Sequence, residues 1–334
     1  MKKVVLMIAL ALCSTVAFAQ KVNKAEMKQM QAFLAQPAEK DATNAQALKI
    51  ANVNDPSTWE GVTVENGRIV EIKWRDKKLA GSLNLSGFQA LRSVDVSRNR
   101  LTGVTVAGDP ALTTLNASRN RLATIDMANC PQLTDVSVNN NRLTDITLQN
   151  IPVLKNLNVS NNLFAQLDLS SSATLQTLNC QGCHLESLNV DNCTALKNLY
   201  AGYNKLTQLT FSGVTNLTNL NIDDNNITNM KTLGHRDCNA LLDLVCSYND
   251  LTELSVTECH RLIFVDCSYN DLTQLSLSNQ TFLQRLLCNN NELTMLDVSF
   301  DSALTYINCR FNQITDLRTM ACPNLTMIAC QWNY

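Results

Sequence analysis

The sequence predicts a repeat solenoid of α/β type that is mostly β, with one long parallel sheet on its concave face, short extended return segments and a small helical N-terminal cap. Two observations predict this fold. Blocks of one pattern begin about every 21 residues along most of the chain, and apolar and Asn positions recur at the same offsets within each block. A fixed short period is typical of a coil of stacked, similar turns.

The clearest block begins at Leu241 and ends at Arg261. Counted from its first Leu, apolar residues stand at offsets 0, +3, +5, +10, +13 and +15, and Asn stands at +8. The step from Leu217 to Leu241 is 24 residues, and we expect the extra residues, within Leu233 to Cys238, to bulge from the return side. The starts define about 13 repeats: Ile69, Leu91, Leu112, Leu133, Leu154, Leu175, Leu196, Leu217, Leu241, Leu262, Leu283, Leu304 and Leu325.

The alternation of offsets predicts where strands lie. Offsets +3 and +5 point inward and alternate with +2, +4 and +6, which is the period of a β-strand. Offsets +13 and +15 alternate again, so the return path is expected to be a short strand. Twenty-one residues leave no room for a full helix in each turn.

An Asn column at +8 is expected to be structural. A buried amide without partners costs about 1–3 kcal/mol, so each side chain should bond to backbone and join one turn to the next. Cys183 interrupts the column, whose other members are Asn99, Asn120, Asn141, Asn162, Asn204, Asn225, Asn249, Asn270, Asn291, Asn312 and Asn333.

The LxxLxLxxN/CxL pattern of these blocks resembles that of leucine-rich repeats over residues 69–334. It is similar in particular to the short, Cys-containing repeats of internalin J and of internalin-like surface proteins of Bacteroidetes. The resemblance implies one parallel strand per repeat and a role in adhesion or host-protein contact.

The N-terminal region is predicted to hold a signal peptide and a cap. Lys2 and Lys3, an apolar run and Ala17-Phe18-Ala19 predict a signal peptide over residues 1–19. Residues 20–68 are predicted to form a helical cap, with one helix over residues 24–35 and a second around residues 44–51. The Trp59-Glu60-Gly61-Val62 stretch resembles the cap of many leucine-rich-repeat proteins.

The cysteines fall on two columns. Cys180, Cys246, Cys267, Cys288, Cys309 and Cys330 stand at +5, where other repeats carry Val, Ala or Ile, so we expect buried, reduced thiols there. Cys130, Cys193, Cys238, Cys259 and Cys322 precede the next block and are expected at a corner of the coil. Whether Cys238 and Cys259 form a disulfide stays open.

No catalytic, cofactor or metal site is predicted. Cys180-Gln181-Gly182-Cys183-His184 matches the c-type haem motif, but both cysteines stand on structural columns, which also argues against zinc. Asp223-Asp224 lacks a calcium-loop spacing and is interpreted as a solvated acidic patch. We therefore expect a protein that is not an enzyme.

Offsets +7 and +9 are predicted to carry the binding surface, on the outward strand face. These positions pass from arginines to aromatic and acidic residues, and exposed Tyr, Trp and Arg are enriched in contact surfaces. The candidate ligand-binding residues are Arg98, Arg100, Arg119, Arg121, Arg142, Tyr203, Asp224, Tyr248, Asp250, Tyr269, Asp271, Phe311 and Trp332.

The expected function is that of a secreted or cell-surface protein that binds an extracellular protein or glycan, with the periplasm left open as a location. The chain has 27 basic and 29 acidic residues, which does not indicate a nucleic-acid partner. The predicted signal segment is too short for stable membrane insertion. The alternative is an assembly subunit that forms a homo-oligomer by end-to-end or dimer contacts through its C-terminal edge.

Overall fold

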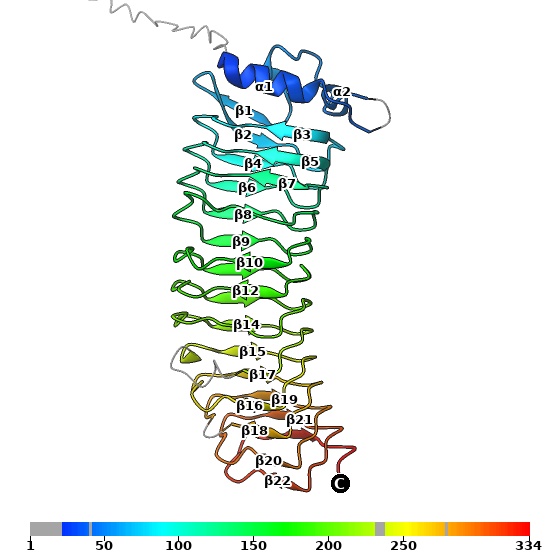
Figure 1. Cartoon of the computed structure of the whole chain (residues 1–334), viewed down its shortest axis with the longest axis vertical. Coiled ribbons are helices and arrows are strands. Elements are labelled where there is room, and N and C mark those ends of the chain that lie inside the picture. The colour runs from blue at the N-terminus through cyan, green and yellow to red at the C-terminus, as the bar shows by residue number, and fades with distance from the viewer. Residues whose placement is uncertain (1–21, 40–41, 231–237, 278–279) are drawn as a thin grey trace, which may run out of the picture.

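Each predicted repeat after the first carries a three-residue strand at offsets +2 to +4, and these strands stack into one long sheet (Figure 1). The computed structural model describes residues 22–39, 42–230, 238–277 and 280–334. The predicted signal peptide and most of the insertion within Leu233 to Cys238 lie outside these residues.

The long sheet has fourteen strands, and all of its pairs are parallel except the first. β1 (Val62–Glu65) and β2 (Arg68–Lys73) form an antiparallel hairpin that starts the stack. The strands that follow are β4 (Ser93–Asp95), β6 (Thr114–Asn116), β8 (Asp135–Ser137), β9 (Asn156–Asn158), β11 (Thr177–Asn179), β13 (Asn198–Tyr200), β14 (Asn219–Asn221), β15 (Asp243–Val245), β17 (Phe264–Asp266), β19 (Arg285–Leu287), β21 (Tyr306–Asn308) and β23 (Met327–Ala329).

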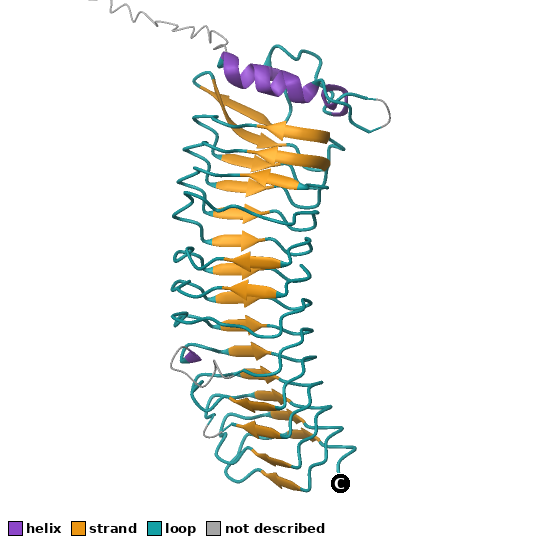
Figure 2. Cartoon of the chain, viewed as in Figure 1, coloured by secondary structure: helices purple, strands orange, loops and turns teal. Residues whose placement is uncertain are grey.

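The return segments are extended, as predicted, and they pair into shorter parallel sheets (Figure 2). One contains β3 (Ala80–Asn84), β5 (Arg100–Thr105) and β7 (Thr124–Asp126). The others pair β10 (Gln166–Asp168) with β12 (Ser187–Asn189), β16 (Glu253–Ser255) with β18 (Gln274–Ser276), and β20 (Met295–Asp297) with β22 (Asp316–Arg318). The predicted fold, a mostly β repeat solenoid, is confirmed.

The core lies between the two sets of strands. The Leu at offset 0 and the apolar residues at +3 and +5 are buried, as Leu241, Leu244 and Cys246 illustrate. Strands β14 and β15 pair directly, with Leu220 opposite Leu244. The 24-residue repeat therefore does not disturb the register of the long sheet.

The N-terminal cap consists of α1 (Lys24–Leu34), α2 (Asn44–Ala47) and the short 3-10 helix η1 (Pro56–Thr58). The second helix is shorter than predicted. Asn44 accepts a bond from the Ala80 amide at 3.1 Å and donates to the Ala80 carbonyl at 2.9 Å, so it satisfies the outer edge of β3. Buried Glu26 accepts from the Ile69 amide at 3.0 Å and pairs with Arg68 at 2.9 Å. The cap thus gives partners to backbone that the first turn would otherwise leave open.

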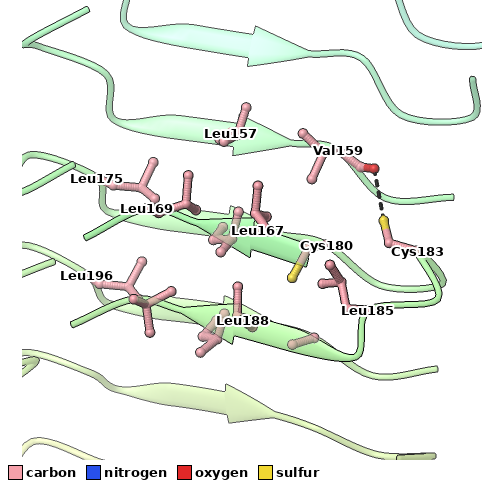
Figure 3. Packing of buried hydrophobic residues seen from close by; sticks show 14 of the residues in the cluster. Leu157, Val159, Leu167, Leu169, Leu175, Cys180, Cys183, Leu185, Leu188 and Leu196 are labelled. Atoms are coloured by element: carbon pink, nitrogen blue, oxygen red, sulfur yellow. Dashed lines mark hydrogen bonds between the residues drawn. The ribbon is translucent and has the colours of Figure 1, made fainter. Parts of the chain in front are cut away.

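The Asn column joins successive turns, as predicted. Asn270 Nδ2 donates to the carbonyls of Cys246, 24 residues earlier, and of Cys267, at 3.0 and 3.1 Å. Its Oδ1 accepts from the Leu251 amide at 3.1 Å. Most of the column is buried, although Asn120, Asn141 and Asn333 are partly exposed. At the exception, the Cys183 thiol donates to the Val159 carbonyl at 3.2 Å, again 24 residues earlier (Figure 3).

A second ladder runs along the opposite corner of the coil. The thiols of Cys130, Cys193 and Cys322 donate to the carbonyls of Val106, Leu169 and Val298, each 24 residues earlier. In the same column, Gln280 Nε2 donates to the Val256 carbonyl at 2.8 Å, with the same separation. The predicted corner position of these cysteines is therefore confirmed, and it has a hydrogen-bonding reason.

We expect Asn270→Ala to lower the urea midpoint of unfolding, because two carbonyls and one amide lose a buried partner. The cost should be about 1–3 kcal/mol for each group left unsatisfied. Asn226→Ala is the matched control, since Asn226 is exposed and follows the Asn225 position on the outside of the turn. Equal midpoints for the two variants would contradict the structural role of the column.

Candidate functional site: the turn ledge

The candidate residues at +7 and +9 lie beside the long sheet and not on it. Its strands span only +2 to +4, so the predicted placement on the strand face is wrong. Offset +7 lies in the turn after the strand, where the backbone is left-handed, as at Arg98 (φ 57°) and Tyr248 (φ 53°). Its amide bonds to the next turn, as Tyr248 N–H does to the Ser268 carbonyl at 3.0 Å. We call the +7 and +9 residues of successive turns the turn ledge.

The aromatic residues of the ledge are exposed and strained. A left-handed φ suits Gly or Asn, and it costs of order 1–3 kcal/mol for a bulky side chain. Other repeats place Asn140, Asn161, Gly182 and Asn290 at +7. The aromatic residues there have φ values of 53–63° and leave 42–71% of their surface exposed; they are Tyr203, Tyr248, Tyr269, Phe311 and Trp332.

Neighbouring aromatic rings on the ledge stack. Tyr248 and Tyr269 lie 4.2 Å apart at an interplanar angle of 8°, and Phe311 and Trp332 lie 5.7 Å apart at 8°. These pairs form flat, rigid surfaces, since in-register turns hold them in place. Asp250 and Asp271 at +9 are exposed beside the first pair. The structure therefore exposes the aromatic and acidic candidates two residues apart on the same turns.

The arginine half is only partly available. Arg100 binds Glu39 of the cap at 2.9 Å, so this candidate already has an anionic partner within the chain. Arg98, Arg119, Arg121 and Arg142 are exposed, and none of them lies within ion-pair distance of a carboxylate in the part of the chain that the structure describes. An anionic group among them would relieve their mutual repulsion.

Sequence reasoning missed an aromatic and arginine group on the strand face itself. Arg285 lies between the rings of Phe264 and Tyr306, with its guanidinium carbon 5.6 and 5.7 Å from the two ring centroids. These residues stand at offset +2 of their repeats and are the first residues of β17, β19 and β21. The outward direction predicted for +2 could have identified them.

The haem-type motif is built into the structural columns. Cys180 and Cys183 are fully buried, and burial raises the pKa of the Cys183 thiol to about 11. Figure 3 shows both sulfurs among core leucines. The other +5 thiols are buried as predicted, except Cys330, which is exposed. Among the described residues, no group of three or more His, Cys, Asp or Glu is placed to hold a metal ion.

Cys238 and Cys259 contact each other at the corner of the coil. A hydrogen bond with Cys238 is the first cause of a strongly raised pKa at Cys259, followed by burial. The two side chains are therefore adjacent, as the sequence predicted for consecutive turns.

No helix in the described part of the chain is long and apolar enough to cross a membrane.

Two buried carboxyls of the corner column have strongly raised pKa values. Burial raises the pKa of Asp109 to about 8 and that of Asp301 to about 6. The backbone N–H groups of Phe88 and Gln280 donate to Asp109 and Asp301, respectively, and lower these pKa values by less than burial raises them. One oxygen of each has no hydrogen-bond partner. A protonated carboxyl could donate as the cysteines of this column do. The fold therefore favours the neutral form, and these groups do not form a catalytic pair.

A family model of leucine-rich repeats (2 copies) matches residues 110–150, and the offsets of that pattern repeat along the whole stack. The chain has the fold of leucine-rich-repeat proteins and resembles them in its repeat pattern. No curated protein matches it by sequence.

Several solved leucine-rich-repeat structures share the fold. The functional domain of internalin J from Listeria monocytogenes, which includes a cysteine ladder, is 24% identical over 78% of this chain and 57% of that one, with a TM-score of 0.53. A leucine-rich-repeat protein of Leptospira interrogans is 19% identical over 77% and 79%, with a TM-score of 0.62. The leucine-rich effector YopM of Yersinia pestis is 23% identical over 75% and 83%, with a TM-score of 0.59. This leucine-rich-repeat chain thus spans little more than half of the internalin J domain.

We expect the stability of the protein to fall between about pH 6 and 8. The folded pKa of Asp109 lies above its unfolded value, so the folded state holds a proton that the unfolded state has already released. The protonated Asp109 contributes to the free energy of unfolding in full below the unfolded pKa, and this contribution is lost as the pH rises to about 8. Between about pH 6 and 8 the loss is up to about 2 kcal/mol.

Asp109→Asn is the test, because an amide resembles the neutral carboxyl. Urea midpoints at pH 6 and pH 8.5 should differ less in Asp109→Asn than in the wild type. Asp126→Asn, an exposed position of β7, is the control and should keep the wild-type difference. A wild-type midpoint that rises with pH over this range would contradict the protonated state of Asp109.

Proposed function

We propose that this chain is a secreted or surface-exposed, non-enzymatic binding protein that recognises an extracellular protein along its turn ledge. The leucine-rich-repeat fold commonly mediates protein binding. The observation that carries the proposal is the row of bulky aromatic residues held exposed in left-handed turns. Strained conformations persist where the surrounding structure holds them, and they cluster at functional sites.

The physical argument is that these residues cost stability where they stand. Asn occupies the same +7 position in other repeats and tolerates a left-handed φ better than Tyr does. Stacking of the rings returns only about 0.5–1.5 kcal/mol for each pair. Rigid, exposed aromatic rings give a partner contact area at a low entropic cost, which supports a binding role.

We expect Tyr248→Asn together with Tyr269→Asn to weaken binding while leaving the melting temperature unchanged or higher. Relief of two strained residues should equal or exceed the lost ring contact. The measurement compares extracellular proteins and glycans captured by the wild type and by the variant. The control replaces Gln166 and Gln274, which are exposed on the return strands, with Ser.

The proposal requires a species that the wild type and the control capture and the Asn variant does not. Capture of the same species by all three proteins would place recognition elsewhere. Arg119→Gln, Arg121→Gln and Arg142→Gln, made together, report on an anionic part of the partner through a change in salt dependence. If the species that the variant no longer captures is a glycan, the ledge is a carbohydrate site and the proposal of a protein partner is wrong.

Assembly through the C-terminal edge is a second candidate. Within the described residues, β23 pairs only with β21, and Met320, Met327, Ile328 and Trp332 are exposed around it. An exposed apolar edge strand can pair with another chain. Light scattering should then give a molar mass that rises with concentration in the wild type and not in Met327→Glu. A monomer mass at all concentrations would exclude this candidate.

A further inference from the structure

The strand face shows how this coil holds a planar cation. Arg285 lies between two aromatic rings that belong to the preceding and the following turn, 5.6 and 5.7 Å from their centroids. Both distances are within the range of a cation–π contact. Two aromatic residues separated by one turn therefore leave a gap that fits a guanidinium.

The turn ledge repeats this order of residues, aromatic, charged and aromatic on three consecutive turns, with a different centre. Tyr203, Asp224 and Tyr248 stand at +7 on three consecutive turns, and β13, β14 and β15 pair in register beneath them. Tyr203 and Tyr248 are 59% and 53% exposed. The short Asp224 between them is exposed and carries a carboxylate in place of the arginine. This gap therefore offers two aromatic neighbours and a negative charge, without a cation of its own between them.

Local contacts hold the first aromatic wall in place. The Tyr203 hydroxyl bonds to Asp223, and this carboxylate, with Asp224, raises the pKa of Tyr203. Gly202 makes room for Asp223, because a Cβ at position 202 would lie 2.0 Å from Asp223 Oδ1. Tyr248 is held from the other side by its stack on Tyr269. Both walls are thus positioned before a ligand arrives.

The charge around the gap is negative. Asp223, Asp243 and Asp250 lie on the same or the following turn as Asp224. Lys205 stands at +9 of the preceding turn, but among the described residues no cationic side chain forms an ion pair with Asp224. Aromatic faces next to carboxylates favour a cation over an anion or a neutral group.

We propose that the gap over Asp224 binds the guanidinium group of an arginine presented by a basic segment of a partner polypeptide. This inference rests on the proposed binding function and names the chemistry of the partner. Tyr203 and Tyr248 supply the ring faces, and Asp224 supplies the charge. The stacked ring of Tyr269 continues the contact surface along the ledge.

The test uses a fluorescein-labelled (Arg-Gly)4 peptide and the full chain. The uncharged (citrulline-Gly)4 peptide has nearly the same shape and is the matched probe. We expect the arginine peptide to bind at least about tenfold more tightly, and Tyr203→Ser with Tyr248→Ser to lose about tenfold, because two cation–π contacts are removed. Asp224→Asn should weaken binding and reduce its salt dependence. Glu186→Gln, an exposed carboxylate on the return side, should bind as the wild type does.

Equal affinity for the arginine and citrulline peptides would overturn the inference, as would wild-type affinity in the Tyr203 and Tyr248 double variant. These outcomes differ from failure of the proposed function. If the arginine peptide does not bind but the Tyr248 and Tyr269 variant still loses its captured species, the ledge binds a partner of other chemistry. If the peptide binds as expected and capture is unchanged, the gap is a cation site outside the partner interface.

Discussion

A donor that reaches a carbonyl of the preceding turn, 24 residues earlier in most repeats, holds the turns of this coil together. Asn270 does so on one corner and Gln280 on the other, and Cys183 and Cys193 supply a thiol where an amide would otherwise stand. Without such donors, each turn would bury unpaired backbone groups at a cost of about 1–3 kcal/mol each. The regular stack, and the level surface it presents, depend on this contact.

Separate columns of the same turn meet separate demands. The residues at 0, +3 and +5 and the two ladders decide whether the coil forms, because they fill the core and bond one turn to the next. Offset +7 only has to accept a left-handed backbone, which many residues can do at some cost. Placing Tyr248 or Trp332 there does not alter the core, so this column can specify a partner independently of the fold.

The sequence predicted the fold closely because each column repeats. The strands at +2 to +4, the buried Asn column and the corner cysteines could all be derived from offsets alone. The placement of the candidate site could not be derived in this way. The strand alternation was extended beyond offset +4, where the chain in fact turns and Tyr248 adopts a left-handed conformation. Contacts between distant segments were also invisible: Glu39 meets Arg100 only because the cap folds over the first turns. The sandwich around Arg285 depends on rings from two other repeats.

The spacing of the turns also limits how a partner chain could lie along the ledge. Adjacent turns are about 4.8 Å apart, whereas an extended polypeptide advances about 3.3 Å per residue. Two turns and three residues cover nearly the same length, roughly 9.6 and 9.9 Å. Residues three apart on an extended strand point to opposite sides, so a strand running parallel to the coil axis would meet the ledge in the same way only at every sixth residue, four turns along. The ledge would then favour extended partners whose contacting side chains recur with a period of six.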